Sequence, residues 1–417
     1  MPFEVPSSWV WTTVGEISQS ILYGVSESAK SQGAYRLLRI TDIQDNTVNW
    51  DTVPFTDYEN EKAEAYLLKD GDILFARTGA TVGKSYLVNS LKEKAIYASY
   101  LIRVQTNHYV LPAFVKYFFE SGFYWEQVLG NSVGIGQPNV NGTILSNLEL
   151  PIPPIMEQKR IVKELGEWLS IIDKIEEGKG RIQKVISLAK SKVLDLAIHG
   201  KLVSQDPTDE PACELLKRIN PKVETISDNG HYQKLPDGWC ITSISEMCEN
   251  INGLWKGKKE PFVKVGVIRN ANFTKDFKLD YSKIEYIDVE ERAFKKRHLL
   301  NGDLIVEKSG GSDNNPVGRA ILYEGKDAIF SFSNFTMVLR IHYKDVLSYK
   351  YLYYYIMSKY QKGEMRLMQT QTTGLHNLIL DKYLDIPLCL PPYQEQQRII
   401  NKIEETFGVL DLIMENL

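Results

Sequence analysis

The chain of 417 residues is too long for one ordinary hydrophobic core, so two or more domains are expected. Its apolar runs are interrupted by charge well before ~18 residues and its N-terminus lacks a signal-peptide pattern, so we expect a cytoplasmic protein without a membrane span. The net charge of −4 and the four scattered cysteines argue against a wholly basic surface, a disulfide framework and a zinc site.

The chain contains an internal duplication. Val5–Trp9 returns as Leu235–Trp239, an offset of 230 residues, and Leu150–Ile161 returns as Leu388–Ile399, an offset of 238 residues. Three further pairs follow in the same order between these two: the segments around Arg39 and Arg269, Leu68–Leu74 and Leu299–Ile305, and Val82–Lys84 and Val317–Arg319. Ordered matches of this kind do not arise easily by chance, so each half contains the same structural unit.

Each copy begins with a globular region of short β-rich runs between Gly, Asn, Asp and Ser turns, such as 72–76, 96–104, 303–306 and 329–341. Each region also holds one aromatic helical stretch, 113–129 or 349–368. In the second stretch we interpret Tyr351, Tyr354, Tyr355 and Met357 as helix core rather than as a base-stacking platform. The pattern therefore predicts the α/β class, with two similar mixed α/β domains over 1–154 and 235–392.

A Pro-Pro step ends each globular region, and a coiled-coil helix is predicted after it, over 155–200 and over 393–417. Apolar residues at alternating spacings of about four and three form its seam: Ile161, Leu165, Trp168, Ile172, Ile175, Ile182, Ile186, Val193 and Leu196 in the first helix, and Ile399, Ile403, Leu410 and Ile413 in the second. Gly178 and Gly180 predict a kink or a break. We expect the two seams to bury each other, with two independent amphipathic core helices as the alternative. The tract 201–234 is predicted to be a linker with one short helix.

Three motifs that suggest an enzyme fail on inspection. Gly79–Ser85 resembles a phosphate-binding loop, but Thr78 stands where a glycine is required and a strand follows instead of a helix. Leu390–Tyr393 lacks the polar residue of a methyltransferase motif, and the six histidines have no metal-binding spacing. We therefore predict no catalytic residue, no metal site and no cofactor.

The residues that carry a family resemblance are Pro153–Val162, Leu196–Val203 with the following Gln205–Pro207, Glu214–Arg218, and the two Gly-Asp turns at Gly71 and Gly302. With these motifs the chain resembles, over essentially its whole length, the specificity (S) subunits of type I restriction–modification systems.

The resemblance implies two target-recognition domains, each reading one half of a bipartite site on double-stranded DNA. The helices would separate these domains and dock two methyltransferase (M) subunits, through which restriction (R) subunits join. Adenine methylation and cleavage would then belong to the partners. The chain departs from this symmetric pattern in one respect, because its second helix stops at Leu417, the position that matches Lys179 in the first helix. Self-association through the longer helix therefore stays open, as does the alternative of a stand-alone DNA-binding regulator.

Base reading needs amide, hydroxyl and guanidinium groups on loops, and phosphate contacts need lysine or arginine. The residues expected to contact DNA in the first domain are Arg39, Arg77, Thr78, Thr81, Lys84, Gln137 and Asn139. Those in the second domain are Lys256, Lys258, Lys259, Arg269, Lys308, Ser309, Asn314, Asn315, Arg319, Gln371, Thr372, Thr373, His376 and Asn377. The alternatives are structural: Arg39 and Arg269 would pair with internal carboxylates, the Gly-Asp turns would only close hairpins, and His376 would be a solvated loop histidine.

Overall fold

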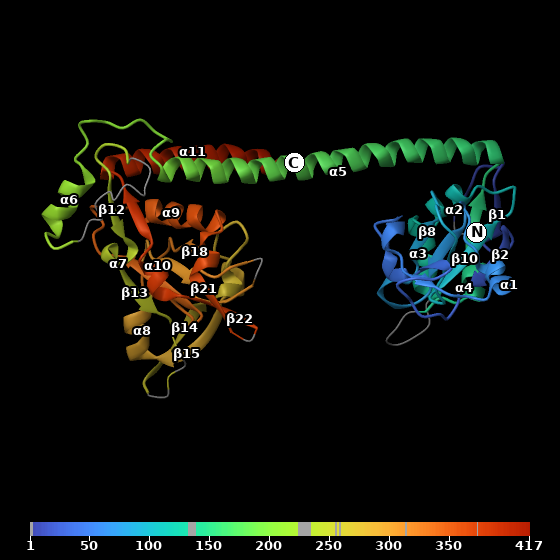
Figure 1. The fold of residues 1–417 in the computed structure, drawn as a ribbon, viewed down its shortest axis with the longest axis horizontal. Helices are drawn as coiled ribbons and strands as arrows, with labels where there is room; N and C mark the ends of the chain where they lie inside the picture. The colour runs from blue at the N-terminus through green and yellow to red at the C-terminus, as the bar shows by residue number, and fades with distance from the viewer. Residues whose placement is uncertain are drawn as a thin grey trace. The chain divides into compact units, whose positions relative to one another are not determined.

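The computed structural model describes residues 3–131, 139–223, 235–254, 257, 260–312, 315–372 and 374–417 (Figure 1). The chain divides into two compact units, Met1–Glu176 and Glu177–Leu417. Each unit contains one mixed α/β domain, which we call domain 1 and domain 2, and each is described below by itself.

Domain 1 is built on a four-stranded antiparallel sheet in the order β2-β10-β7-β8. Its strands are β2 (Ser18–Tyr23), β10 (Leu101–Thr106), β7 (Ile73–Ala76) and β8 (Ser85–Leu87). A second sheet joins β6 (Phe55–Thr56), β3 (Tyr35–Leu38) and β9 (Ala95–Tyr97), and β1 (Val10–Thr13) pairs with β11 (Glu149–Ile152). The helices are α1 (Asn60–Ala63), α2 (Pro112–Phe118), α3 (Gly122–Asn131) and α4 (Gly142–Ser146).

Both faces of the four-stranded sheet are buried. Ile73 and Phe75 of β7 pack in one apolar cluster with residues of α2 and α3, whereas Leu74 and Ala76 pack in another with residues of β3 and β9. Successive side chains of a strand point to opposite faces, so one strand contributes to two cores. This arrangement holds the end of β7, and the loop that follows it, in a fixed place.

Domain 2 repeats these sheets. The four-stranded sheet has the order β13-β20-β16-β18, with β13 (Cys248–Asn252), β20 (Thr336–Ile341), β16 (Leu304–Glu307) and β18 (Ala320–Leu322). The others are β15 (Glu285–Glu290), β14 (Phe262–Ile268) and β19 (Phe330–Phe332); β12 (Cys240–Ser243) with β23 (Pro387–Leu390); and β17 (Ser309–Gly311), β22 (Leu375–Leu378) and β21 (Gln369–Thr372). The helices are α7 (Ile244–Met247), α8 (Glu291–Arg297), α9 (Tyr349–Gln361) and α10 (Leu380–Leu384). The predicted repeat of mixed α/β domains is confirmed.

The aromatic stripe of α9 belongs to the core of domain 2. Tyr351, Tyr355 and Met357 are buried, and the hydroxyls of Tyr351 and Tyr355 donate to the carbonyls of Cys389 and Pro387. Burial keeps these phenols protonated by raising their pKa well above its usual value. The interpretation of this stripe as helix core is therefore confirmed for these residues.

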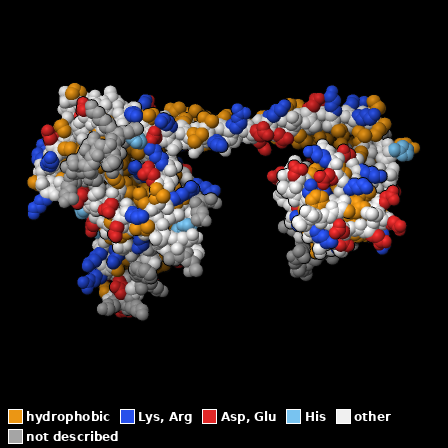
Figure 2. Space-filling view, in the orientation of Figure 1, with side chains coloured by type: hydrophobic (Ala, Val, Ile, Leu, Met, Phe, Trp, Pro, Cys, Tyr) orange, Lys and Arg blue, Asp and Glu red, His pale blue; other side chains and the backbone are white. Residues whose placement is uncertain are grey.

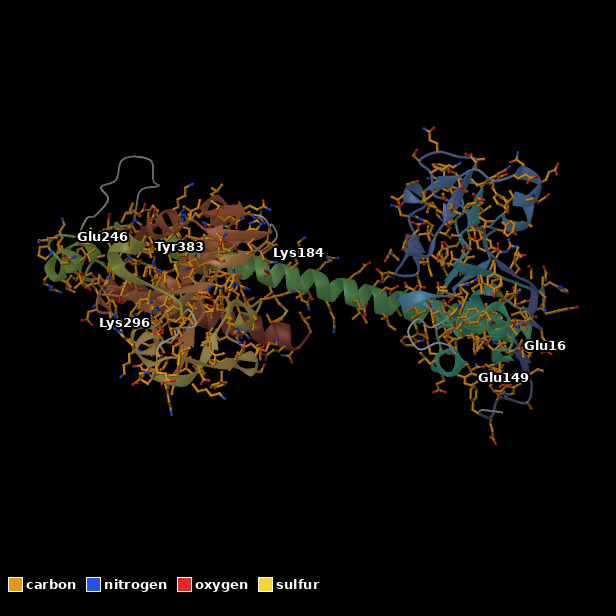
Figure 3. All side chains as sticks on the ribbon, turned by 90° about the horizontal axis from the view of Figure 1, so that it is seen from below. Glu16, Glu149, Lys184, Glu246, Lys296 and Tyr383 are labelled. Atoms are coloured by element: carbon orange, nitrogen blue, oxygen red, sulfur yellow. The ribbon has the colours of Figure 1, made fainter. Side chains whose placement is uncertain are left out.

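The central helix, α5 (Ile155–Ile198), is one helix of 44 residues (Figure 3). The expected break at Gly178 and Gly180 is wrong, because both glycines are α-helical. A glycine costs only about 1 kcal/mol relative to alanine inside a helix. Here strong helix formers such as Glu176, Glu177 and Arg181 stand on either side, so the helix continues.

A buried glutamine attaches the start of each long helix to its own domain. Gln158 of α5 accepts a hydrogen bond from the Leu111 amide (2.8 Å) and donates to the Pro153 carbonyl (2.9 Å). Gln396 of α11 (Tyr393–Glu415) accepts from the Ser348 amide (2.8 Å) and donates to the carbonyl of Pro391 (3.0 Å). The two copies therefore use the same joint.

In the second unit, α11 lies along the last part of α5 (Figure 1). Ile399 and Ile403 are buried in one cluster with Leu194, Ala197 and Ile198 of α5 and with α9. Lys190 of α5 forms an ion pair with Asp411 and lies 5.0 Å from the centre of the Phe407 ring. The two helices are therefore paired, as predicted, but the buried residues of α5 differ in part from the predicted seam. Ile186 is buried, whereas Val193 and Leu196 are only half-buried and Ile182 is exposed.

The segment after α5, which carries part of the family resemblance, is fixed to domain 2 and leads into α6 (Ala212–Ile219). The buried carboxylate of Glu395 accepts hydrogen bonds from Trp239 Nε1 (2.9 Å) and Gln205 Nε2 (3.1 Å). Asp209 forms an ion pair with Arg398 at 2.6 Å. Burial raises the pKa of Glu395, and these donors lower it in part. The start of the 201–234 tract is therefore an ordered part of domain 2.

Candidate nucleic-acid interface

The structure joins two of the loops expected to contact DNA in domain 1. The Arg77 carbonyl accepts a hydrogen bond from the Val140 amide (2.9 Å), and Thr78 forms a β-bridge with Asn139. The Arg77 amide donates to the Tyr100 carbonyl (3.1 Å) on its other side. We call residues 77–84 with 139–142 loop pair 1. Its backbone is tied down on both sides of Arg77, so that side chain projects from a fixed position.

Domain 2 repeats this junction. Ser309 on β17 pairs with Asn377 on β22, and the Lys308 carbonyl accepts a hydrogen bond from the Leu378 amide (2.8 Å). The side chain of Asn270 donates to the Ser309 carbonyl (2.6 Å). We call residues 308–319 with 369–378 loop pair 2. Segments that the sequence suggested separately are therefore brought together in each domain.

A buried tyrosine holds the far end of each loop. The hydroxyl of Tyr124 donates to the Gly83 carbonyl (2.5 Å), and that of Tyr383, labelled in Figure 3, donates to the Gly318 carbonyl (3.2 Å). Both glycines have positive φ, of 86° and 93°. A Cβ on Gly83 would also approach the Trp125 ring to 2.7 Å. Each loop therefore needs a glycine at this point.

A buried aspartate at the start of the strand that leads into each loop pairs with an arginine of the neighbouring strand. In domain 2, Arg340 donates to both carboxylate oxygens of Asp303 (2.9 and 2.7 Å), and this raises the pKa of Arg340. In domain 1, Arg103 lies 3.9 Å from the carboxylate of Asp72. Both aspartates also accept from a turn amide, at 2.9 Å for Asp72 and 2.8 Å for Asp303. The Gly-Asp turns are thus structural, as their alternative interpretation expects.

Three of the arginines expected to contact DNA lie beside carboxylates instead. Arg39 donates to Asp42 (2.7 Å), which raises the pKa of Arg39. Arg269 forms an ion pair with Glu285, and Arg319 lies 3.4 Å from Glu307. Burial raises the pKa of Glu307. These three side chains therefore have structural roles in the fold.

Other expected cations lack a carboxylate partner among the described residues. The Arg77 guanidinium lies over the Tyr23 ring, 5.0 Å from its centre. Lys308 donates to Asn252 Oδ1 (2.9 Å), and burial lowers the pKa of Lys308. Lys84 is exposed at the rim of a cavity of about 560 Å³ that Trp125 also lines.

The remaining candidates have varied surroundings. Asn139, Asn315 and Gln371 are exposed, while Thr78, Thr81, Ser309 and Asn377 are half-buried. His376 lies on β22, between β17 and β21, with only 6% of its surface exposed, so the expectation of a solvated loop histidine is wrong. Gln137, Lys256, Lys258, Lys259, Asn314 and Thr373, and the side chain of Thr372, lie outside the described residues.

Sequence reasoning missed Tyr23 and Asn252. Each ends the first strand of its four-stranded sheet and precedes a glycine, Gly24 or Gly253. A Cβ at either glycine would fall within 2.5 Å of a carbonyl oxygen in the neighbouring segment. The repeated glycine after the strand was the available signal, because it marks a close approach of two backbones.

In the part of the chain that the structure describes, no group of three or more histidine, cysteine, aspartate or glutamate residues could hold a metal ion. Among the same residues, no helix is long and apolar enough to cross a membrane.

Known proteins match this architecture. Residues 6–185 and 236–415 each match the family described as type I restriction modification DNA specificity domain. The chain is 21% identical to the type I restriction enzyme StySPI specificity subunit of Salmonella potsdam, over 98% of this chain and 84% of that protein. It is 22% identical to the EcoEI specificity subunit of Escherichia coli, over 100% of this chain and 80% of that protein.

Solved structures agree in fold. A chain from a study of complex assembly and conformational transition of the type I R-M system superposes with a TM-score of 0.71, at 18% identity over 100% of this chain and 94% of that one. The HsdS subunit of Thermoanaerobacter tengcongensis gives 0.52, at 16% identity over 99% of this chain and 93% of that one. The alternative of a stand-alone regulator is not favoured by these matches. The chain belongs to the family of type I restriction–modification specificity subunits, whose role is to determine the DNA sequence that is recognised.

Proposed function

We propose that this chain reads a bipartite DNA target, with domain 1 (residues 1–154) on one half-site and domain 2 (235–392) on the other. The observation that carries the proposal is the repeated loop pair. In both domains a loop after the second core strand is bridged to a distant loop, and both present a cation that has no carboxylate partner among the described residues. Two similar DNA-recognition domains in one chain would fit a DNA target with two specific half-sites.

The helical regions, 155–200 and 393–417, would dock the partner subunits. Each copy joins its helix to its domain by the same buried glutamine, which supports two similar docking surfaces and hence two methyltransferase subunits. The first part of α5 also exposes apolar side chains that a partner could cover, and hydrophobic groups are visible along this helix in Figure 2. Restriction subunits would join through the methyltransferase subunits, in the cytoplasm.

Catalysis would belong to those partners, and this chain would contribute recognition alone. Its duplicated loops offer amides, hydroxyls and cations, which are the groups that read base edges and contact phosphates. The methyltransferase subunits would supply the cofactor site and the reacting groups.

The test is co-purification of the full chain with a type I methyltransferase subunit, followed by genome-wide sequencing of methylated adenine. We expect a stable complex and a motif of two defined segments around an undefined spacer. Thr81→Ala in domain 1 and Gln371→Ala in domain 2 should each change the preference in one half-site only. Both side chains lie on loop pairs and carry no hydrogen bond that the fold depends on among the described residues.

Two results would contradict the proposal. One is a single contiguous motif, which a pair of separate readers would not produce. The other is a change in the same half-site for both variants, since the two loops lie in different domains. Normal complex formation without methylation would show that docking is preserved while recognition is lost.

A further inference from the structure

Arg77 differs from the other arginines of domain 1. Arg36 pairs with Glu93, Arg39 with Asp42 and Arg103 with Asp72. Arg77 alone has no carboxylate partner among the described residues, although it stands at the start of a loop where the backbone is fixed. A guanidinium without a counter-ion at such a place is available to an anionic or strongly polar ligand outside the chain.

The geometry around Arg77 limits which of its donors can face that ligand. The guanidinium lies over the Tyr23 ring, and Nε is buried without a hydrogen-bond partner among the described residues. Tyr23 is itself held by its hydroxyl, which accepts a hydrogen bond from the Gly142 amide (2.6 Å). Stacking on a fixed ring keeps the planar fork in one orientation and leaves its two terminal nitrogens as donors.

Two parallel donors at fixed separation match one base edge best. Guanine presents O6 and N7 as adjacent acceptors in the major groove, whereas adenine and cytosine each place an amino donor there and thymine offers one acceptor beside a methyl group. A phosphate also accepts two hydrogen bonds, but it carries no sequence information.

We propose that Arg77 reads a guanine in the half-site of domain 1 through its two terminal nitrogens, and that Tyr23 is the positioning residue for that fork. The inference rests on the proposed function and specifies one base of its target. The equivalent place in domain 2 supports it, because Lys308 is also a cation without a carboxylate partner among the described residues, and Asn252 stands where Tyr23 does. Lysine is the other residue that commonly binds the guanine edge.

The experiment uses the full chain in complex with the methyltransferase subunit and maps methylated motifs for Arg77→Gln and Arg77→Ala. We expect the preference for guanine at one position of one half-site to be lost, with discrimination against the other bases falling roughly 5- to 150-fold. The motif of the other half-site should stay unchanged. Tyr23→Phe keeps the ring but removes the hydroxyl that bonds to Gly142, so it should weaken the preference for this guanine less than Tyr23→Leu, which removes the ring as well. Lys94→Gln is the matched control, since it removes one exposed positive charge of domain 1 away from the loop pair and should change no base.

Each other result overturns the assignment. An unchanged motif shows that Arg77 reads nothing, and relaxation at a position that is not guanine shows that it reads another base. Weaker binding to all sequences with a flatter salt dependence shows a phosphate contact instead. Folding is checked by co-purification and thermal unfolding, and Arg77→Lys, which retains the charge but not the fork, should still weaken the preference for guanine. A wild-type complex that methylates no defined motif contradicts the proposed function itself, whereas a defined motif that ignores Arg77 contradicts only this inference.

Discussion

The first part of α5 and α11 carry the same apolar pattern, yet the first turns of the two helices are covered very differently. Leu165 of α5 and Ile403 of α11 occupy equivalent positions, 238 residues apart, as Leu150 and Leu388 do. Leu165 is 39% exposed, whereas Ile403 is fully buried. Further along, the difference is small, because Ile175 of α5 and its equivalent Ile413 of α11 are 56% and 45% exposed. The pattern identifies the apolar face of a helix, but the neighbouring elements decide whether that face is covered.

The buried residues of α11 lie in its first half, from Glu395 to Ile403. Helix α9 and the last part of α5 both pack on it, and the ion pair between Lys190 and Asp411 fixes their alignment. No described residue plays these roles for the seam at 161–175. The same sequence signal therefore gives buried residues at the start of one helix and exposed residues in the other.

Truncation of equivalent seam residues tests this difference most strongly. Ile403→Ala should destabilise the protein by about 2 to 5 kcal/mol, because it leaves a cavity in a closed core. Leu165→Ala should cost only about 0.5 kcal/mol, since its side chain is partly in water already. Urea unfolding of the two full-length variants measures both values, and co-purification with the methyltransferase subunit measures docking. Equal losses of stability would show that the first part of α5 is covered in solution.

Replacing the two buried glutamines tests whether the joint between helix and domain contributes equally to stability in both copies. Gln158→Ala and Gln396→Ala each leave one backbone amide and two carbonyls without their present partner. An unsatisfied buried polar group costs about 1 to 3 kcal/mol, so similar losses are expected at both sites. Hydrogen exchange at the Leu111 and Ser348 amides should rise locally in the respective variant. A loss confined to one site would break the equivalence of the two joints.

The smallest expected change in the free energy of unfolding comes from an ion pair near the C-terminal end of α5. Lys362, the residue after α9, pairs with Asp195 at 2.5 Å and is the main cause that lowers the pKa of that carboxyl from 3.8 to about 2. A lowered folded-state pKa stabilises the protein above the unfolded pKa, and this contribution is lost as the pH falls from about 4 toward 2. Asp195→Asn should therefore cost about 1 kcal/mol at pH 7, after allowance for its partial exposure, and progressively less below pH 4.

The control is Asp173→Asn, in the first part of α5, where the side chain is exposed and has no ion pair among the described residues. It should change the free energy of unfolding little at either pH. An Asp195 effect that does not depend on pH would mean that the ion pair is not its source.

Sequence alone was sufficient for the repeated α/β domains and the long helices. Periodicity and duplicated motifs depend only on local order along the chain, so these features are visible without coordinates. The uninterrupted α5 was missed because a pair of glycines weakens a helix by less than its neighbours favour it.

The partners of individual side chains could not be predicted. That Arg39 meets Asp42 was one of two open interpretations, and nothing in the sequence joined Arg77 to Tyr23, whose contact spans separate strands. Likewise, Leu194 and Ala197 replaced part of the predicted seam because α9, and not only α11, packs on the end of α5. Tertiary packing decides such pairings, and a local pattern does not contain it.

The fixed first residue of each loop has an evolutionary consequence. The two copies keep the Asp–Arg pair at the start of the preceding strand, the glycine of positive φ and the bridge to a second loop, but Arg77 begins the loop in one copy and Lys308 in the other. A replacement of this residue leaves those supports intact, so its effect on folding is small. On the proposed function, sequence preference can therefore change by single substitutions with little loss of stability.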